Sequence, residues 1–267
     1  EIIGVDIDPR DTRQEPEKSE LPKAKTQRGF MNELSNTFDA SRVSSEDIER
    51  LIHSHGQTTS EDVFPALYGS IQRAVDLVVW CESHEDVVAL VELAQKHNVC
   101  LVPYGGGTNV SAALVLPADE SRMIVSVDLR RMNRLLNLDA ENRTATFEAG
   151  VYGGELENVL YEHGFTAGHE PDSIELSTLG GWIATYASGM KKNRYGNIED
   201  IVLNASMVTP AGVVEHRRSF PRYSHGVQAI SPLFGSEGNF GIITRATIRI
   251  RSLPEVKEYN SFLFHSV

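Results

Sequence analysis

The first half of the chain contains one clearly patterned stretch of apolar and polar positions. Residues 76–80 form a short apolar run, as in a buried strand. Ser83 and Asp86 then have the spacing of a capping box, and the apolar residues of the following stretch, 87–94, recur at helical intervals. A second apolar run covers residues 99–102. This succession predicts a right-handed βαβ unit that leads directly into a glycine-rich loop.

Shorter patterns predict the remaining elements. Ser44 is placed to cap a helix whose apolar face carries Ile48 and Leu51. The proline and glycine of residues 210–212 predict a hairpin turn. Further strands are expected over residues 124–129, 144–148, 201–208, 213–215 and 242–251, and further helices over 155–163 and 177–189. The chain has no internal repeat, and we expect two α+β lobes that divide near residues 130–135.

Composition and charge narrow the classes of function. The chain has 267 residues, with 25 basic and 37 acidic side chains and a formal net charge of −12, so it lacks the basic footprint of a nucleic-acid-binding protein. Two cysteines are too few for a disulfide scaffold or a four-thiolate metal site, and no run of ~18 apolar residues predicts a transmembrane helix. His169, Glu170 and Asp172 lack a second ligand cluster, so no metal site is expected. Residues 1–30 are rich in charge and predict an exposed arm.

Many of the 21 glycines fall into clusters, the first of which follows the strand predicted over residues 99–102. Residues 105–109 read Gly-Gly-Gly-Thr-Asn, and consecutive glycines let several backbone N–H groups converge on an anion. Val110 stands where a dinucleotide fingerprint needs glycine or alanine, and no Gly-Lys-Ser/Thr sequence follows. Those two phosphate-binding loops are therefore excluded, and a flexible turn remains the alternative to an anion site.

Three further segments have comparable patterns. In residues 168–182, hydroxyl residues precede a predicted helix with two glycines in its first turn, which permits the close approach of a planar or anionic ligand. Residues 185–200 contain three basic side chains within four positions, a local reversal of charge that suggests an anionic ligand. Residues 235–244 place three glycines just before a strand. Each segment alone could be a surface loop, but four of them favour one extended ligand.

The order of these motifs is shared with a known superfamily. The strings are Gly-Gly-Gly-Thr, Asp-Ser-x-Glu-x-Ser-Thr-x-Gly-Gly-Trp, Ala-Ser-Gly and Gly-Ser-Glu-Gly-x-x-Gly-Ile-Ile-Thr. Together they resemble the FAD-binding domain of the vanillyl-alcohol oxidase (PCMH) type. Residues 168–173, 188–193 and 195–200 closely resemble the alkyldihydroxyacetonephosphate synthase family in particular. The resemblance runs from about residue 75 to residue 254, and more weakly back to residues 53–56.

This resemblance implies an α+β, two-lobed FAD-binding domain with a small N-terminal extension. The implied divisions are an arm and helical extension (1–70), the FAD-binding domain (71–253, with lobes 71–132 and 133–253) and the start of a C-terminal cap (254–267). The catalytic acid and base of the family lie in that cap. We therefore expect this chain to be a fragment of the enzyme that is inactive by itself.

The resemblance also implies which residues bind the cofactor. Residues 103–109 contain no histidine of the kind that attaches FAD covalently in some relatives, so non-covalent binding is expected. Tyr186 departs from the arginine that relatives carry at that position. The implied cofactor-binding residues are Pro103, Tyr104, Gly105, Gly106, Gly107, Thr108, Asn109, Asp172, Ser173, Ile174, Glu175, Leu176, Ser177, Thr178, Thr185, Tyr186, Ala187, Ser188, Glu237, Gly238, Asn239, Phe240, Gly241, Ile242 and Ile243.

The implied activity is that of an alkylglycerone-phosphate synthase, a transferase of ether lipid biosynthesis. It exchanges the acyl group of acyl-dihydroxyacetone phosphate for a long-chain fatty alcohol and uses FAD without net redox. The family is peroxisomal, and we expect the full enzyme to associate peripherally with a membrane, with a homodimer as one conceivable assembly. Neither terminus of this chain carries a peroxisomal targeting signal.

Two other functions stay open at this point. A FAD-linked 2-hydroxyacid dehydrogenase, acting on D-lactate or glycolate, shares the FAD loops. It would usually carry an Asn-Ala-Gly-Gly-like stretch where this chain reads Tyr-Ala-Ser-Gly-Met-Lys-Lys over residues 186–192. A non-catalytic flavin-binding module is the second alternative. The sequence that follows residue 267 in the whole protein would separate these functions.

Overall fold

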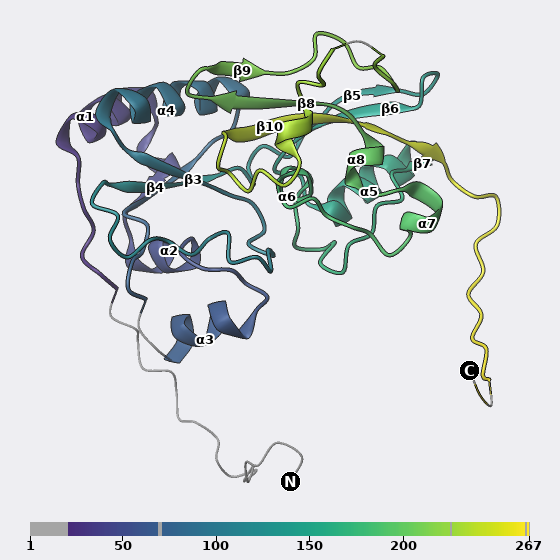
Figure 1. The fold of residues 1–267 in the computed structure, drawn as a ribbon, viewed down its shortest axis with the longest axis horizontal. Coiled ribbons are helices and arrows are strands. Elements are labelled where there is room, and N and C mark those ends of the chain that lie inside the picture. The colour runs from purple at the N-terminus through teal and green to yellow at the C-terminus, as the bar shows by residue number, and fades with distance from the viewer. Residues whose placement is uncertain (1–20, 69–70, 225, 265, 267) are drawn as a thin grey trace.

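Two β-sheets form the framework of the chain (Figure 1). The computed structural model describes residues 21–68, 71–224, 226–264 and 266. The first sheet has the strand order β1-β2-β4-β3, and the second has the order β5-β6-β10-β8-β9. The boundary between lobes at residues 132 and 133 stays a prediction, and the two sheets fall on either side of it in the sequence.

The first sheet contains the predicted βαβ unit. Its strands are β1 (Val43–Ser44), β2 (Leu77–Trp80), β3 (Cys100–Tyr104) and β4 (Ile124–Asp128). β2, β4 and β3 run parallel, whereas β1 pairs with β2 in the antiparallel direction. β4 lies between β2 and β3, so the two strands of the βαβ unit are not neighbours. The carboxyl ends of three parallel strands therefore meet at one edge, where loops can build a site.

The second sheet is antiparallel throughout. Its strands are β5 (Leu135–Asp139), β6 (Thr144–Glu148), β8 (Val202–Thr209), β9 (Gly212–Val214) and β10 (Ile242–Arg249). A third, two-stranded sheet pairs β7 (Phe165–Thr166) with β11 (Arg251–Ser252). The hairpin predicted over residues 210–212 is confirmed, because Thr209 pairs with Gly212.

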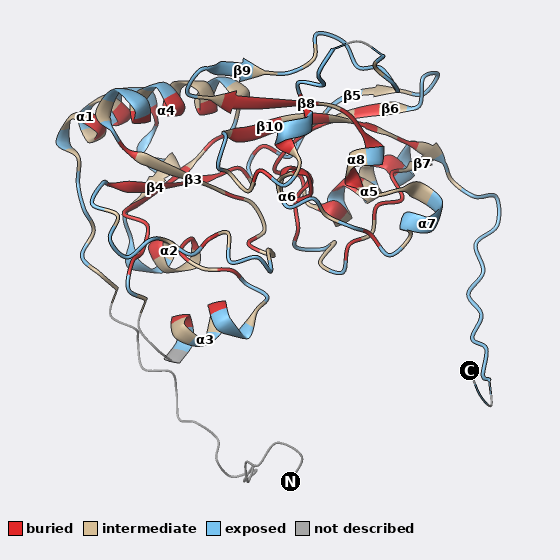
Figure 2. Cartoon of the chain, viewed as in Figure 1, coloured by how far each residue is buried: buried red, intermediate tan, exposed pale blue. Residues whose placement is uncertain are grey.

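Helices cover the sheets and join them. The helices are α1 (Arg28–Thr37), α2 (Asp47–Ile52), α3 (Ser60–Tyr68), α4 (His84–His97), α5 (Gly153–Glu162), α6 (Leu179–Ala184), α7 (Lys192–Tyr195) and α8 (Ile198–Ile201), with short 3-10 turns η1 (Ala40–Arg42) and η2 (Ser231–Leu233). One apolar core lies between α5, α6, α8 and the second sheet. A second core contains Leu90 of α4, Val125 of β4 and Val208 of β8, so α4 packs against both sheets, and Figure 2 shows its inner side as buried.

The capping prediction for α4 is confirmed in detail. The Ser83 hydroxyl accepts a hydrogen bond from the Asp86 backbone N–H at 3.1 Å, and the Asp86 carboxylate accepts one from the Ser83 N–H at 2.9 Å. Asn98 ends the helix in the left-handed conformation, with φ of 53°. Local sequence alone is sufficient here because each contact is made within one turn of the helix.

Two predicted helices were wrong at their ends. Ser44 does not cap α2, because it belongs to β1 and pairs there with Val78 of β2. The helix begins three residues later. The helix expected over residues 177–189 ends at Ala184. Tyr186, two residues beyond that end, has φ of 56°, which a right-handed helix excludes.

The expected exposed arm is also only partly correct. Its residues 1–20 lie outside the described residues. α1 begins at Arg28, and Phe30 and Leu34 are buried in the core beside α4. Ahead of the helix, the Lys25 N–H donates to the Asp76 carboxylate at 2.9 Å. Residues 21–38 are therefore packed against the domain, because apolar side chains with wide spacing at 30, 34 and 38 supply a helical face.

Candidate functional site

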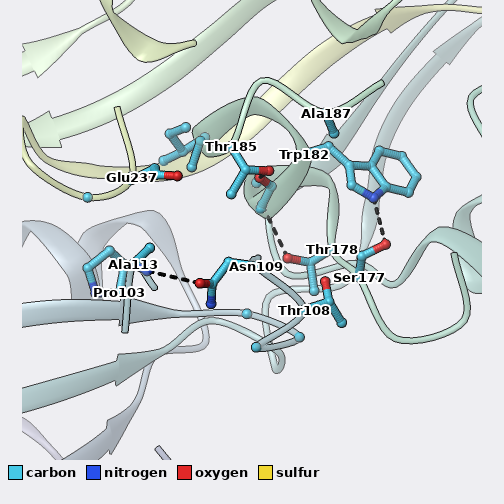
Figure 3. A pocket seen from close by; sticks show the side chains of 18 of the residues that line it. Pro103, Thr108, Asn109, Ala113, Ser177, Thr178, Trp182, Thr185, Ala187 and Glu237 are labelled. Atoms are coloured by element: carbon cyan, nitrogen blue, oxygen red, sulfur yellow. Dashed lines mark hydrogen bonds between the residues drawn. The ribbon is translucent and has the colours of Figure 1, made fainter. Parts of the chain in front are cut away.

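A cavity of about 410 Å³ lies where the carboxyl ends of the parallel strands face α6 (Figure 3). The four glycine-containing segments singled out in the sequence all contribute to its wall. The predicted site residues that line it are Pro103, Tyr104, Gly105, Gly106, Gly107, Thr108, Asn109, Ser173, Ser177, Thr178, Thr185, Tyr186, Ala187, Ser188, Glu237, Gly238, Gly241 and Ile243. Residues more than a hundred positions apart in sequence thus form one surface.

The other predicted site residues do not line the cavity. They are Asp172, Ile174, Glu175, Leu176, Asn239, Phe240 and Ile242. Ile242 is buried in the core around α4, and the side chains of Leu176 and Phe240 are exposed to solvent. These residues lie within continuous predicted segments, but successive side chains point in different directions, so only part of each segment faces the cavity.

Sequence reasoning missed part of the wall. The additional lining residues are Val102, Val110, Ser111, Ala113, Leu114, Leu129, Ala149, Pro171, Gly180, Gly181, Trp182, Ala184 and Ser236. Gly180 and Gly181 were not among the residues assigned to the cofactor, although the sequence marked this predicted helix start as a place where a ligand could approach closely. The apolar residues, such as Leu129 and Ala149, had no local signal, since only the folded topology brings them to the cavity.

The loop that follows β3 lines the cavity and carries backbone donors that the described chain leaves unused. Among the described residues, no acceptor is found for the backbone N–H groups of residues 105–109. Gly107 has φ of 66°, in the left-handed region, which turns the loop. Unpaired backbone N–H groups in succession form a concave site for an anion. The predicted anion-binding character of this loop is thus supported by its hydrogen-bond pattern.

The glycines of this loop serve a second purpose that the sequence did not reveal. A Cβ atom on Gly106 would lie 1.8 Å from the carbonyl oxygen of Leu176, and one on Gly105 would lie 2.4 Å from the Thr178 hydroxyl. No real Cβ makes contacts this short. The glycines are required because the loop packs directly against residues 176–178, and this packing sets the shape of the cavity.

The start of α6 does not offer free N–H donors. Leu179 and Gly180 donate to the carbonyls of Val151 and Ala149, and Gly181 donates to the Thr178 hydroxyl at 3.3 Å (Figure 3). Gly180 and Gly181 line the cavity, so the expected close approach of a ligand at this helix start stays a prediction, but the N–H groups of residues 179–181 already have acceptors within the chain. Gly180 also permits close packing within the chain, since a Cβ on Gly180 would lie 2.8 Å from the Ala149 side chain.

The basic segment also does not face the cavity. Lys191 pairs with the carboxylate of Glu170, and Lys191, Lys192 and Arg194 are absent from the cavity wall. Glu237 is the one charged residue among those that line it. The suggestion that this basic run contacts an anionic ligand in the cavity is not supported, because its first lysine is neutralised by Glu170.

Residues 235–241, which contribute to the cavity wall, are joined to the segment that follows the loop 105–109. The Ser111 hydroxyl donates a hydrogen bond to the Glu237 carboxylate. Glu237 has φ of 44°, its N–H donates to the Ala184 carbonyl at 2.9 Å, and a Cβ on Gly238 would lie 2.8 Å from Pro103. Residues 235–241 therefore sit close against the end of β3 and restrict the width of the cavity.

The buried side chain of His169 lies behind Trp182, a residue of the cavity wall. His169 is 1% exposed, and its ring lies 4.8 Å from the ring of Trp182, which lines the cavity. Within the part of the chain that the structure describes, neither ring nitrogen has a hydrogen-bond partner. Burial lowers the pKa of this imidazole to about 4, so it is neutral near pH 7.

Two kinds of feature are absent from residues 21–68, 71–224, 226–264 and 266. Over these ranges, no group of three or more His, Cys, Asp or Glu side chains is arranged to hold a metal ion. None of the helices that the structure describes combines the length and apolarity needed to cross a bilayer.

Comparison with known proteins identifies the domain. A family model described as FAD binding domain matches residues 75–217. The chain belongs to this family of FAD-binding domains. The match confirms FAD as the expected cofactor. The matched range includes residues 105–109, whose backbone N–H groups have no acceptor among the described residues.

Alkyldihydroxyacetonephosphate synthases are similar to this FAD-binding domain in sequence and structure. The chain is 45% identical to the synthase of Caenorhabditis elegans over 80% of its own length, and it covers 36% of that protein. A solved alkyldihydroxyacetonephosphate synthase structure matches 91% of the chain with a TM-score of 0.85 and 36% identity, and the match covers 44% of that structure. These findings confirm the predicted α+β fold and the resemblance to synthases.

A 2-hydroxyacid dehydrogenase gives a weaker match. The mitochondrial D-lactate dehydrogenase (cytochrome) of Arabidopsis thaliana is 32% identical over 67% of the chain, which covers 31% of that protein. The chain spans less than half the length of each of these relatives.

Proposed function

We propose that the chain binds FAD non-covalently in the 410 Å³ cavity and forms the cofactor-binding part of an alkyldihydroxyacetonephosphate synthase. The observation that carries the proposal is the row of N–H groups over residues 105–109, in the wall of that cavity, that have no acceptor in the described part of the chain. Such donors suit the pyrophosphate of a flavin dinucleotide. The 45% identity to a synthase supports the choice of enzyme.

The residues present fit this cofactor. Residues 105–109 would hold the pyrophosphate, and the hydroxyl and small residues Thr185 and Ser188 would line the cofactor further along the cavity. Glu237, Gly238, Gly241 and Ile243 would approach it from the second lobe. Bound FAD would supply an electron-accepting flavin ring, whereas this chain binds and orients it and excludes water from one side.

The proposed reaction exchanges the acyl group of acyl-dihydroxyacetone phosphate for a long-chain fatty alcohol, in ether lipid biosynthesis. Its substrates are lipids, which is consistent with peripheral membrane association of the whole protein. We also propose that the whole protein is peroxisomal and forms a homodimer. The similarity to alkyldihydroxyacetonephosphate synthases supports these finer assignments.

An activity assay on the whole protein that contains this chain distinguishes the candidates. We expect it to convert palmitoyl-dihydroxyacetone phosphate and hexadecanol into the alkyl product and palmitate, without an external electron acceptor. D-lactate and glycolate are expected not to reduce a dye in its presence. Dye reduction by a 2-hydroxyacid, without ether formation, would instead favour the dehydrogenase. Neither activity, in a protein that binds FAD, would favour a non-catalytic flavin module.

A further inference from the structure

His53 is a buried histidine outside the cavity wall that is held from two sides. It caps the C-terminal end of α2 and is 0% exposed. Its Nδ1 lies 2.7 Å from the carbonyl oxygen of Glu49, and its Nε2 lies 3.0 Å from the carboxylate of Asp128. Because both ring nitrogens meet an oxygen atom, the ring has one fixed orientation.

Asp128 connects this histidine to the end of β4. Its carboxylate is 0% exposed and also accepts hydrogen bonds from the Arg130 side chain and backbone N–H. Burial acts to raise the pKa of this carboxyl, but the hydrogen bonds from His53 and Arg130 outweigh burial and keep the pKa below its ordinary value. Asp128 is therefore ionised, and it anchors His53 and Arg130 together.

The same cluster supports the loop that lines the cavity. The Tyr104 ring lies 4.5 Å from the His53 ring, and the Arg130 guanidinium lies 5.2 Å from the centre of the Tyr104 ring. Tyr104 is 3% exposed and directly precedes the loop 105–109. Gln57, four residues after His53, donates its backbone N–H to the Gly107 carbonyl at 2.7 Å, and its side-chain amide lies 3.4 Å from the Tyr104 hydroxyl.

We propose that His53 is a positioning residue for cofactor binding, which acts through Asp128, Tyr104 and Gln57 on the loop 105–109. Among the described residues, its hydrogen-bond and ring partners lie outside that loop. By fixing Tyr104 at the start of the loop and the turn that carries Gln57, it holds the unpaired N–H groups in a single arrangement before the ligand arrives. Preorganised donors bind an anion more tightly than mobile ones, because less ordering is required on binding. This inference rests on the proposed binding of FAD.

Binding measurements on three variants of the chain test the assignment. His53→Gln removes the imidazole ring and Asp128→Asn removes the carboxylate charge that strengthens their shared hydrogen bond, each at nearly constant volume, and the double variant removes both. The dissociation constant for FAD is measured by quenching of flavin fluorescence, and the free energy of unfolding of each apoprotein is measured by denaturant titration. His55→Gln is the matched control, since His55 lies two residues away and its Nδ1 lies 2.6 Å from the neighbouring Gly56 carbonyl oxygen.

We expect each single variant to raise the FAD dissociation constant about tenfold, and the double variant to raise it by no more than about tenfold. His55→Gln should leave it within about twofold. Unchanged affinity in both single variants, with only the stability lowered, would overturn the positioning role. So would additive effects on affinity. If the unaltered chain itself binds no FAD, the proposed function fails, and this outcome is distinct from the failure of His53 alone.

A variant at an exposed position keeps the test decisive if the buried variants do not fold. Gln57→Ala removes the side-chain contact to Tyr104 at an exposed site. We expect it to raise the dissociation constant for FAD about threefold without a change in the unfolding midpoint. Full affinity in this variant would contradict the proposed route from His53 to the loop.

Discussion

Gly106→Ala is expected to abolish high-affinity FAD binding and to lower the free energy of unfolding by about 2–3 kcal/mol. The added Cβ would lie 1.8 Å from the Leu176 carbonyl oxygen and 2.7 Å from its carbonyl carbon. Both obstacles are backbone atoms, so no side-chain rotation relieves the overlap. Either the loop or residues 176–178 must move, and each movement changes the cavity wall.

Gly154→Ala is the matched control for this substitution. Gly154 lies in the first turn of α5, and the nearest atom to its added Cβ is 4.0 Å away. We expect this variant to gain about 0.5–1 kcal/mol of stability, because alanine loses less backbone entropy than glycine on folding. Flavin fluorescence titration and denaturant unfolding of both variants provide the comparison. Normal affinity and stability in Gly106→Ala would show that the close contact with Leu176 does not exist.

We expect acid to destabilise the folded chain through His169, the second of the two largest effects predicted here. The pKa of this buried imidazole is about 4, against about 6.5 when exposed, so below pH 6.5 the unfolded chain binds a proton that the folded chain does not. The stabilisation from its neutral form is complete above pH 6.5 and is lost as the pH falls toward 4. We expect the unfolding free energy to decrease by roughly 2 kcal/mol from this group over that window.

His169→Phe isolates this contribution from the other acid-titrating groups. Phenylalanine keeps a flat ring against Trp182 and removes two ring nitrogens that have no partner among the described residues. Denaturant unfolding of both proteins at several pH values between 7.5 and 4.5 gives the comparison. The difference in stability between them should shift in favour of His169→Phe as the pH falls. A constant difference across the whole range would mean that His169 does not titrate differently on folding.

The sequence was most informative where one segment determines its own structure. The Ser83–Asp86 capping box and the left-handed Asn98 fix α4 through contacts within a single turn. The glycine loop after β3 was recognisable because consecutive glycines free backbone N–H groups regardless of the distant chain. The motif order further led to the FAD-binding family and to most residues of the cavity wall.

Long-range contacts explain what sequence reasoning could not predict. Gly106 is required by Leu176, seventy residues later, so its role as a packing residue depends on the folded topology. Lys191 is neutralised by Glu170, which a local count of basic residues does not consider. The N–H groups at the start of α6 are consumed by the carbonyls of residues 149 and 151. For Lys191 and the start of α6, a local pattern suggested a ligand contact, and another part of the same chain makes a contact there instead.

FAD titration of the apoprotein tests the central claim most directly. Binding of FAD and, separately, of riboflavin is followed by flavin fluorescence, and ADP is added as a competitor of bound FAD. Because the donors of residues 105–109 are proposed to hold the pyrophosphate, we expect one FAD per chain, displacement by ADP, and binding of riboflavin at least about a hundredfold weaker. Failure to bind FAD, or equal affinity for riboflavin and FAD, would contradict the account.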